Sequence, residues 1–279
     1  MVTASSDPVS AFVEADAAGH TATIFADIRA TLGVEVVNLI WRHLATMPGA
    51  LEWTWGELKP LYQGPALAHA DDVRNWLPLP AVPPFSRDTL TAAGIGAADR
   101  ASIGSILESY HHTNALALVV FGGLLARFGG RPGAETVVVE APAPDVISQS
   151  VPRALPRLTP LSELAPPVAR LVEELNGFGE DGDFALVASM YRHLSHWPAY
   201  LALVRTLLAP LQANGELQSL VNAARRMAAL HGWALAPLLS GSELPPSIVE
   251  ALAAVRRFVE HPIARMSGVC ALIRHATPT

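Results

Sequence analysis

The sequence has little cysteine, little lysine and no long apolar run, and each shortage excludes a class of protein. With one cysteine, Cys270, in 279 residues, the chain can form neither an internal disulfide nor a Cys-x-x-Cys pair for zinc or redox chemistry. Lys59 is the only lysine, and a net charge of -6 without a basic run argues against nucleic acid as a partner. The longest apolar stretch, Ala115 to Ala126, is shorter than the roughly 20 residues that span a bilayer. We therefore expect a core helix there and no membrane partner.

The first twenty residues contain acids where a signal peptide needs a basic start and a continuous apolar segment, which predicts a cytoplasmic location.

An apolar fraction of 51% is enough for one large core or two medium ones. The densest charge cluster is Glu180, Asp181 and Asp183, in a glycine-rich loop. We expect a solvated connection at this cluster rather than a cation site.

One motif occurs twice in the chain. The stretches WRHLATMPGAL, at Trp41–Leu51, and YRHLSHWPAYL, at Tyr191–Leu201, share Arg-His-Leu, a spacer and Pro-x-x-Leu. A gapless overlay of Trp41–Tyr62 on Tyr191–Gln212 gives 8 identities in 22 positions, and the segments further downstream correspond at a similar offset. We interpret the chain as a tandem duplication.

The apolar positions of each copy recur at intervals of three and four, which predicts helices and an all-α fold class. Pro48 and Pro198 each mark a tight corner between two helices, because proline fits the first helical turn but not the interior. One β-like run, Thr136 to Ala141, has nothing obvious to pair with.

Seven prolines between Pro142 and Pro167 predict an extended, rather stiff linker. We expect a first helical repeat at 20–141, this linker at 142–167 and a second helical repeat at 168–279. Two homologous halves in one chain normally pack about a pseudo-two-fold axis, as a covalent pseudo-dimer, and the cleft between them is the natural ligand site.

Three stretches carry a resemblance to a known family. FADIRATLGVEVVNLIWRHLATMPGALEW, SYHHTNALALVV and SMYRHLSHWPAYL resemble the group I 2-haloacid dehalogenases, and the similarity extends from about Ile24 to Ile273. The resemblance implies an all-helical pseudo-dimer in which an Asp activates a water for direct attack on the halogen-bearing carbon, without a covalent ester.

Transferred position by position, the family's asparagine falls on Asn114 and its serine on Ser189, so both are expected to position substrate or water. The water-activating Asp falls on Met190, which can neither accept a proton nor hold a hydroxide. Since a positioned general base contributes about 10²- to 10⁴-fold, the substrate or the reaction is expected to have diverged.

The family's aromatic pocket residues fall on smaller aliphatic ones here. Val36 and Leu39 stand for a Trp and a Phe, and Val259 stands for a Tyr. The resemblance therefore implies a wider, more apolar cavity for a larger small molecule. The predicted substrate-binding residues are Val36, Leu39, Met190, Tyr191 and Val259.

Histidines offer further chemistry. Ser189 and His193 are four residues apart and share a helix face, so they could form a nucleophile and base, with Glu35 or Glu108 orienting the imidazole. Because Arg-His recurs in the copy that lacks the serine, a structural role for His193, with its nitrogens bonded to backbone, is favoured. His112 is the acid-base candidate near the pocket, and with Glu108 it could also hold a metal.

The sequence thus predicts an enzyme on the group I 2-haloacid dehalogenase scaffold, by default a hydrolase of 2-haloalkanoic acids that uses no cofactor and no metal. Its predicted catalytic residues are Asn114, Ser189 and His112. The expected partner is a small-molecule substrate, and a homodimer is left open. The alternative is a small-molecule binder, or a histidine-dependent haem or metal enzyme that uses the same cleft.

Overall fold

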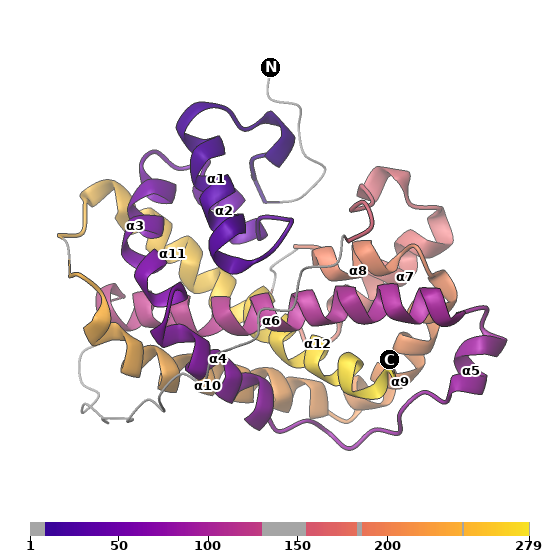
Figure 1. Ribbon diagram of the computed structural model, residues 1–279. Helices are drawn as coiled ribbons and strands as arrows, with labels where there is room; N and C mark the ends of the chain where they lie inside the picture. The colour runs from indigo at the N-terminus through magenta and orange to yellow at the C-terminus, as the bar shows by residue number, and fades with distance from the viewer. Residues whose placement is uncertain (1–8, 130–154, 183–185, 242, 279) are drawn as a thin grey trace.

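The computed structural model describes residues 9–129, 155–182, 186–241 and 243–278, and the regular elements within these ranges are all helical (Figure 1). The all-α prediction is therefore confirmed for the described residues, while the β-like run at 136–141 lies outside them. Up to residue 129 the elements are η1 (Glu14–Asp16), α1 (Gly19–Leu32), α2 (Leu39–Leu44), α3 (Ala50–Tyr62), α4 (Pro65–Trp76), α5 (Arg87–Ala92) and α6 (Ala97–Phe128). From residue 155 they are η2 (Leu161–Glu163), α7 (Pro166–Gly177), α8 (Ser189–Leu194), α9 (Pro198–Ala213), α10 (Glu216–Leu235), η3 (Ala236–Leu238), η4 (Pro246–Ile248), α11 (Val249–Phe258), the π-helical turn η5 (Val259–Ile263) and α12 (Ala264–Ala276).

The 32-residue helix α6 runs through the middle of the molecule, and α4, α10 and α12 pack along it (Figure 1). Every residue of α6 from Ala115 to Leu124 is buried, as expected for a helix that other helices surround. The predicted core helix is thus part of α6. In the part of the chain that the structure describes, no helix is long and apolar enough to cross a membrane.

Prolines lie at or near the start of two helices and inside one widened helical turn. Pro198 is the first residue of α9, and Pro48 lies in the connection that leads into α3, which agrees with the two predicted corners. Pro262 lies inside η5, the π-helical turn that joins α11 to α12. Because proline has no N–H and its ring clashes with the carbonyl four residues earlier, a widened turn accommodates it within a nearly continuous helix.

The crossing of α6 and α10 brings two backbones into direct contact. A Cβ atom placed on Gly232 would lie 2.5 Å from the carbonyl carbon of Gly122, and a Cβ on Gly122 would collide with the carbonyl oxygen of Ala228. Real Cβ atoms do not approach backbone this closely, so these positions need glycine for space and not for a special backbone conformation. Substitutions at these two glycines are therefore tolerated less well than substitutions in an ordinary apolar contact between helices.

Gly232→Ala is expected to lower the free energy of unfolding by about 2 kcal/mol or more, because the added methyl group forces α6 and α10 apart in a packed core. Urea denaturation followed by circular dichroism measures the change. Gly56→Ala is the matched control, since a Cβ on Gly56 in α3 meets nothing within 4 Å and alanine favours a helix by up to ~1 kcal/mol. Equal stability of the two variants would contradict the close crossing.

Candidate functional site

A cavity of about 90 Å³ lies where elements from both halves of the sequence meet. Its walls come from the coil before α2, from α2, from the middle of α6, from the start of α8 and from the joint between α11 and α12. The apolar lining residues are Val34, Val36, Val37, Leu39, Ile40, Leu155, Leu186, Ala188, Met190, Phe258, Pro262, Ile263 and Met266. The polar ones are Asn38, Arg42, Ser109, Tyr110, Thr113, Asn114 and Ser189.

Five of the predicted site residues meet on the wall of this cavity: Asn114, Ser189, Met190, Val36 and Leu39. They come from α6, from the first turn of α8, and from the coil and first residue of α2. Residues far apart in the chain are thus brought to one small space. Their roles in binding or catalysis remain predictions.

Three predicted residues lie elsewhere. His112 is two positions from Asn114 on α6, about 200° around the helix, so it points away from the cavity, and its Nδ1 atom lies 3.3 Å from Nη1 of Arg74. Tyr191 is 1% exposed and is not part of the cavity wall. Val259 lines a second cavity of about 440 Å³ between α6, α10 and η5, while its neighbour Phe258 lines the first.

The cavity is small. Drug-sized ligands occupy pockets of about 300–1,000 Å³, whereas this cavity has a volume of about 90 Å³. Phe258 and Met266 also line it. The volume suits a molecule of a few heavy atoms, and a cavity wider than that of the family stays a prediction.

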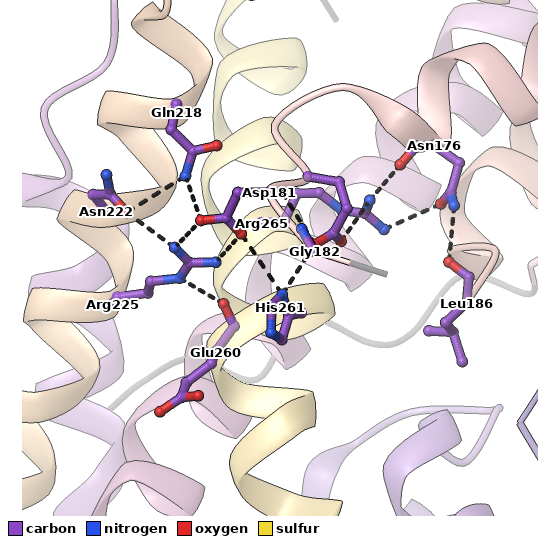
Figure 2. A network of polar contacts seen from close by, with 11 residues as sticks. Asn176, Asp181, Gly182, Leu186, Gln218, Asn222, Arg225, Glu260, His261 and Arg265 are labelled. Atoms are coloured by element: carbon purple, nitrogen blue, oxygen red, sulfur yellow. Dashed lines mark hydrogen bonds and ion pairs between the residues drawn. The ribbon is translucent and has the colours of Figure 1, made fainter. Parts of the chain in front are cut away.

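Asn176, in α7, holds the segment that leads into α8. Its amide nitrogen donates to the Leu186 carbonyl at 2.9 Å (Figure 2). Its amide oxygen accepts from the Ala188 N–H at 3.0 Å. Arg265 of α12, 2% exposed, donates in turn to the backbone and side-chain oxygens of Asn176. This buried polar contact fixes the backbone immediately before Ser189.

The coil before α2 is held in a related way. The Glu14 carboxylate accepts the N–H of Val37 at 2.6 Å and pairs with Arg29 at 3.0 Å. Val36 and Leu39 flank the anchored residue, so the contact positions that wall of the cavity.

Tyr110 connects the cavity wall to His193. The hydroxyl of Tyr110 lies 2.8 Å from Nδ1 of His193, and Ser189 is near enough to Tyr110 to lower the pKa that burial raises. Tyr110 and Ser189 line the cavity, and His193 lies behind them, 1% exposed.

Burial sets the ionisation of these two groups. Burial raises the pKa of Tyr110 and lowers the pKa of His193 to about 4, and the charges of His196 and Arg192 lower the latter further. Near neutral pH, Tyr110 therefore carries its proton and His193 is neutral. The bond between them joins a neutral phenol to a neutral imidazole, in which the histidine tautomer sets the donor.

Asn114 presents a buried donor without a partner. Its side chain is 8% exposed, it lines the cavity, and its Nδ2 atom has no hydrogen-bond partner among the described residues. A buried amide in this state is costly unless water or a ligand accepts from it. The cavity therefore has a place for an oxygen or halide acceptor beside Asn114.

The charge on the cavity wall is positive. Arg42 lines it, with Nε 3.2 Å from the Val37 carbonyl and Nη1 3.4 Å from the Phe12 carbonyl. Among the described lining residues there is no Asp or Glu. The cavity therefore favours a neutral or anionic small molecule.

The hypothetical Ser189–His193–carboxylate triad is not assembled. Tyr110 stands between the serine and the imidazole, Glu35 accepts the N–H of Leu155 at 3.0 Å, and Glu108 pairs with Arg274 at 2.6 Å. The favoured structural role, with both histidine nitrogens on backbone, is also wrong for Nδ1 of His193, which faces Tyr110.

In the acidic cluster, Asp181 is exposed in a loop, as expected, whereas Glu180 is largely buried, contrary to expectation; Asp183 lies outside the described residues. The Glu180 side chain is 12% exposed and contacts Arg265 at 3.1 Å and His261 at 2.9 Å. Asp181 receives both Nη atoms of Arg225 at 2.7 Å (Figure 2). Spacing along the sequence gave no signal for these pairs, because the cations lie 44 to 85 residues downstream.

The fold is that of the D-2-haloacid dehalogenases. One solved structure, of a D-2-haloacid dehalogenase mutant with D-2-CPA, matches with a TM-score of 0.72 over 98% of this chain and 96% of that chain, at 16% identity. Another, of a D-2-haloacid dehalogenase with L-LA, matches with a TM-score of 0.72 over 99% and 97%, also at 16% identity.

Sequence relatives point the same way, although no family model matches the chain. An (R)-2-haloacid dehalogenase of Rhizobium sp. (strain NHG3) is 45% identical over 49 residues, which are 18% of this chain and 19% of the relative. An (R)-2-haloacid dehalogenase of Pseudomonas putida is 32% identical over 111 residues, 37% of each chain. A configuration-inverting 2-haloacid dehalogenase of Alcaligenes xylosoxydans xylosoxydans is 27% identical over 221 residues, 76% of this chain and 74% of the relative.

By sequence and by structure, the chain is therefore related to the D-2-haloacid, configuration-inverting dehalogenases. The matches to the first two sequence relatives span only about a fifth and just over a third of their length.

Acidification is expected to lower the free energy of unfolding, because burial lowers the pKa of His111 and of His193 to about 4. As the pH falls through about 6.5, the unfolded chain takes up protons that the folded chain does not, and the loss is complete near pH 4. Each histidine contributes at most ~3 kcal/mol to this loss. Urea unfolding at pH 7 and at successive lower values measures it.

His111→Gln should make the pH dependence of unfolding shallower, since the buried imidazole is replaced by a group that does not titrate. His275→Gln, at an exposed position, should leave the pH dependence as it is. The same slope in wild type and His111→Gln would show that burial of this imidazole does not drive the acid loss.

Proposed function

We propose that this protein is a small-molecule enzyme on the 2-haloacid dehalogenase scaffold, and that its default reaction is hydrolytic removal of halide from 2-haloalkanoic acids by direct attack of water. One observation carries the proposal: the unpaired amide of Asn114, the hydroxyl of Ser189 and the Tyr110–His193 hydrogen bond border the same small cavity. The relatedness to dehalogenases supports the reaction class.

The residues of the cavity divide into a polar side and an apolar wall. Asn114 and Ser189 would hold the attacking water, and the charge of Arg42 would favour the substrate carboxylate. Val36, Leu39 and Met190 would contact the carbon chain of the substrate.

Met190 stands at the position of the family's base, so the chain needs another proton acceptor. His193, with a pKa of about 4, has the basicity of an ordinary carboxylate. The proton of the attacking water would pass to Ser189, the serine proton to Tyr110, and the tyrosine proton to Nδ1 of His193. Halide would leave with its bonding electrons, and the product would be a 2-hydroxy acid.

Water is proposed as the nucleophile instead of Ser189. Direct displacement of halide by the serine oxygen would form an ether, which water does not cleave under mild conditions. The enzyme would then stop after one turnover.

The pseudo-dimer is also proposed, with repeats at 20–141 and 168–279 joined by the linker at 142–167. The order α2–α3–α4 and the order α8–α9–α10 support it, since corresponding helices begin roughly 150 residues apart. The cavity draws residues from both proposed repeats.

A small-molecule binder is the second candidate. The absence of a carboxylate among the described lining residues favours it, because a binding site needs no base. A haem enzyme is less favoured, since the cavity of about 90 Å³ is far below the roughly 300 Å³ at which drug-sized pockets begin.

Tyr110→Phe tests the proton chain. The variant keeps the ring but removes the hydroxyl between Ser189 and His193, so kcat for halide release from racemic 2-chloropropionate should fall by about 10²- to 10⁴-fold. Tyr62→Phe is the control, because Tyr62 is a buried tyrosine that does not line the cavity. An ion-selective electrode or ion chromatography follows the halide.

Wild-type kcat should also fall as the pH drops through about 4, where His193 takes up a proton. Met190→Asp should raise the rate in the Tyr110→Phe background, since it supplies a base directly. If wild type releases no halide and Met190→Asp does, the native protein is not a dehalogenase, and the binder becomes the better proposal.

A further inference from the structure

We propose that His69, Asp72 and His231 bind a divalent transition-metal ion of the zinc type, which ties α4 to α10. Nδ1 of His69 lies 2.9 Å from Nδ1 of His231, and one ligand atom from each of the three residues lies within 4.8 Å of the others. The two histidines are 2% and 5% exposed, and Asp72 is half-buried. Imidazole and carboxylate together are a donor set that zinc accepts.

The placement of the three side chains follows from their helices. His69 and Asp72 are three residues apart on α4 and therefore share a face. His231 comes from the last turns of α10, which packs against α4. Because two different helices supply the ligands, an ion bound here would connect distant parts of the chain.

The two facing nitrogens share one proton, whose place a metal ion could take. Two imidazole lone pairs repel at 2.9 Å, so one Nδ1 now donates a proton to the other. Burial lowers the pKa of both rings, so they are neutral near pH 7. Moving one proton from Nδ1 to Nε2 of the donating ring would free both lone pairs for a metal ion without net loss of a proton.

The distances require only a small adjustment. Zinc bonds nitrogen at about 2.0–2.1 Å, so two tetrahedral nitrogen ligands lie about 3.3 Å apart. The observed 2.9 Å would open by about 0.4 Å, which a rotation of the imidazole rings can provide. Three protein ligands leave a fourth position for water.

A second cluster, Glu180, Asp181 and His261, does not offer the same site. Its carboxylates already contact Arg265 and Arg225, whose charges would repel a divalent cation (Figure 2). Near Asp72, by contrast, Arg74, two residues further along α4 and about 200° around the helix, pairs with Asp71. Of the two clusters, the one with His69, Asp72 and His231 is therefore the better candidate for a divalent cation.

Zinc titration of the full-length, chelator-treated protein tests the proposal. Isothermal titration calorimetry should show one Zn²⁺ per chain with micromolar or tighter affinity, and Zn²⁺ should raise Tm. Co²⁺ used in place of Zn²⁺ should give the visible absorption bands of a four-coordinate site. His231→Gln and Asp72→Asn should each weaken binding at least tenfold.

His261→Gln and His275→Gln are the matched controls and should bind Zn²⁺ as wild type does, because one belongs to the second cluster and the other is an exposed histidine. Asp72→Asn changes only a half-buried side chain, so it keeps the test valid if His231→Gln does not fold. The proposal would be overturned if the wild-type protein did not bind Zn²⁺ stoichiometrically. It would also be overturned if Zn²⁺ binding were lost in His261→Gln and kept in Asp72→Asn.

Discussion

The close crossing of α6 and α10 is the constraint on which the rest of the structure depends. Without side chains at Gly122 and Gly232, the two backbones come into contact, and the distance between the helices is set by main-chain atoms. About two turns earlier, α6 carries Asn114 to the cavity. His231 directly precedes Gly232 in α10, and it bonds to His69 of α4. A shift of α6 would displace Asn114, and a shift of α10 would displace His231.

Polar groups do two different kinds of work around this crossing. Arg265 and Asn176 form a buried network that holds the backbone before α8 in one position (Figure 2). The hydrogen bond between Tyr110 and His193 joins two groups that are uncharged near neutral pH. The contacts of Arg265 fix geometry, because leaving a buried guanidinium unpaired is costly. The proposed proton transfer would use the neutral pair.

Local patterns in the sequence allowed part of the site to be predicted. The buried run in α6 and the prolines beside α3 and α9 show in the periodicity and composition, and the resemblance led to Asn114, Ser189 and Met190 on one cavity wall. The link from Tyr110 to His193 was missed, because their separation of 83 residues leaves no spacing signal. Phe258, the last residue of α11, lines the cavity, whereas Val259, the first residue of η5, lines the second cavity, a difference of one position that the transfer along the sequence did not resolve.

The sequence by itself determined the helices, the corner before α9 and the residue types available for chemistry, because these depend on neighbours within a few positions along the chain. Only the tertiary structure decided which polar groups meet. Tyr110 bonds to His193, and Arg265 holds Asn176, through contacts between helices that are distant in sequence. The physical reason is that hydrogen bonds and burial act over a few ångströms in space, and helix packing sets that distance independently of sequence separation.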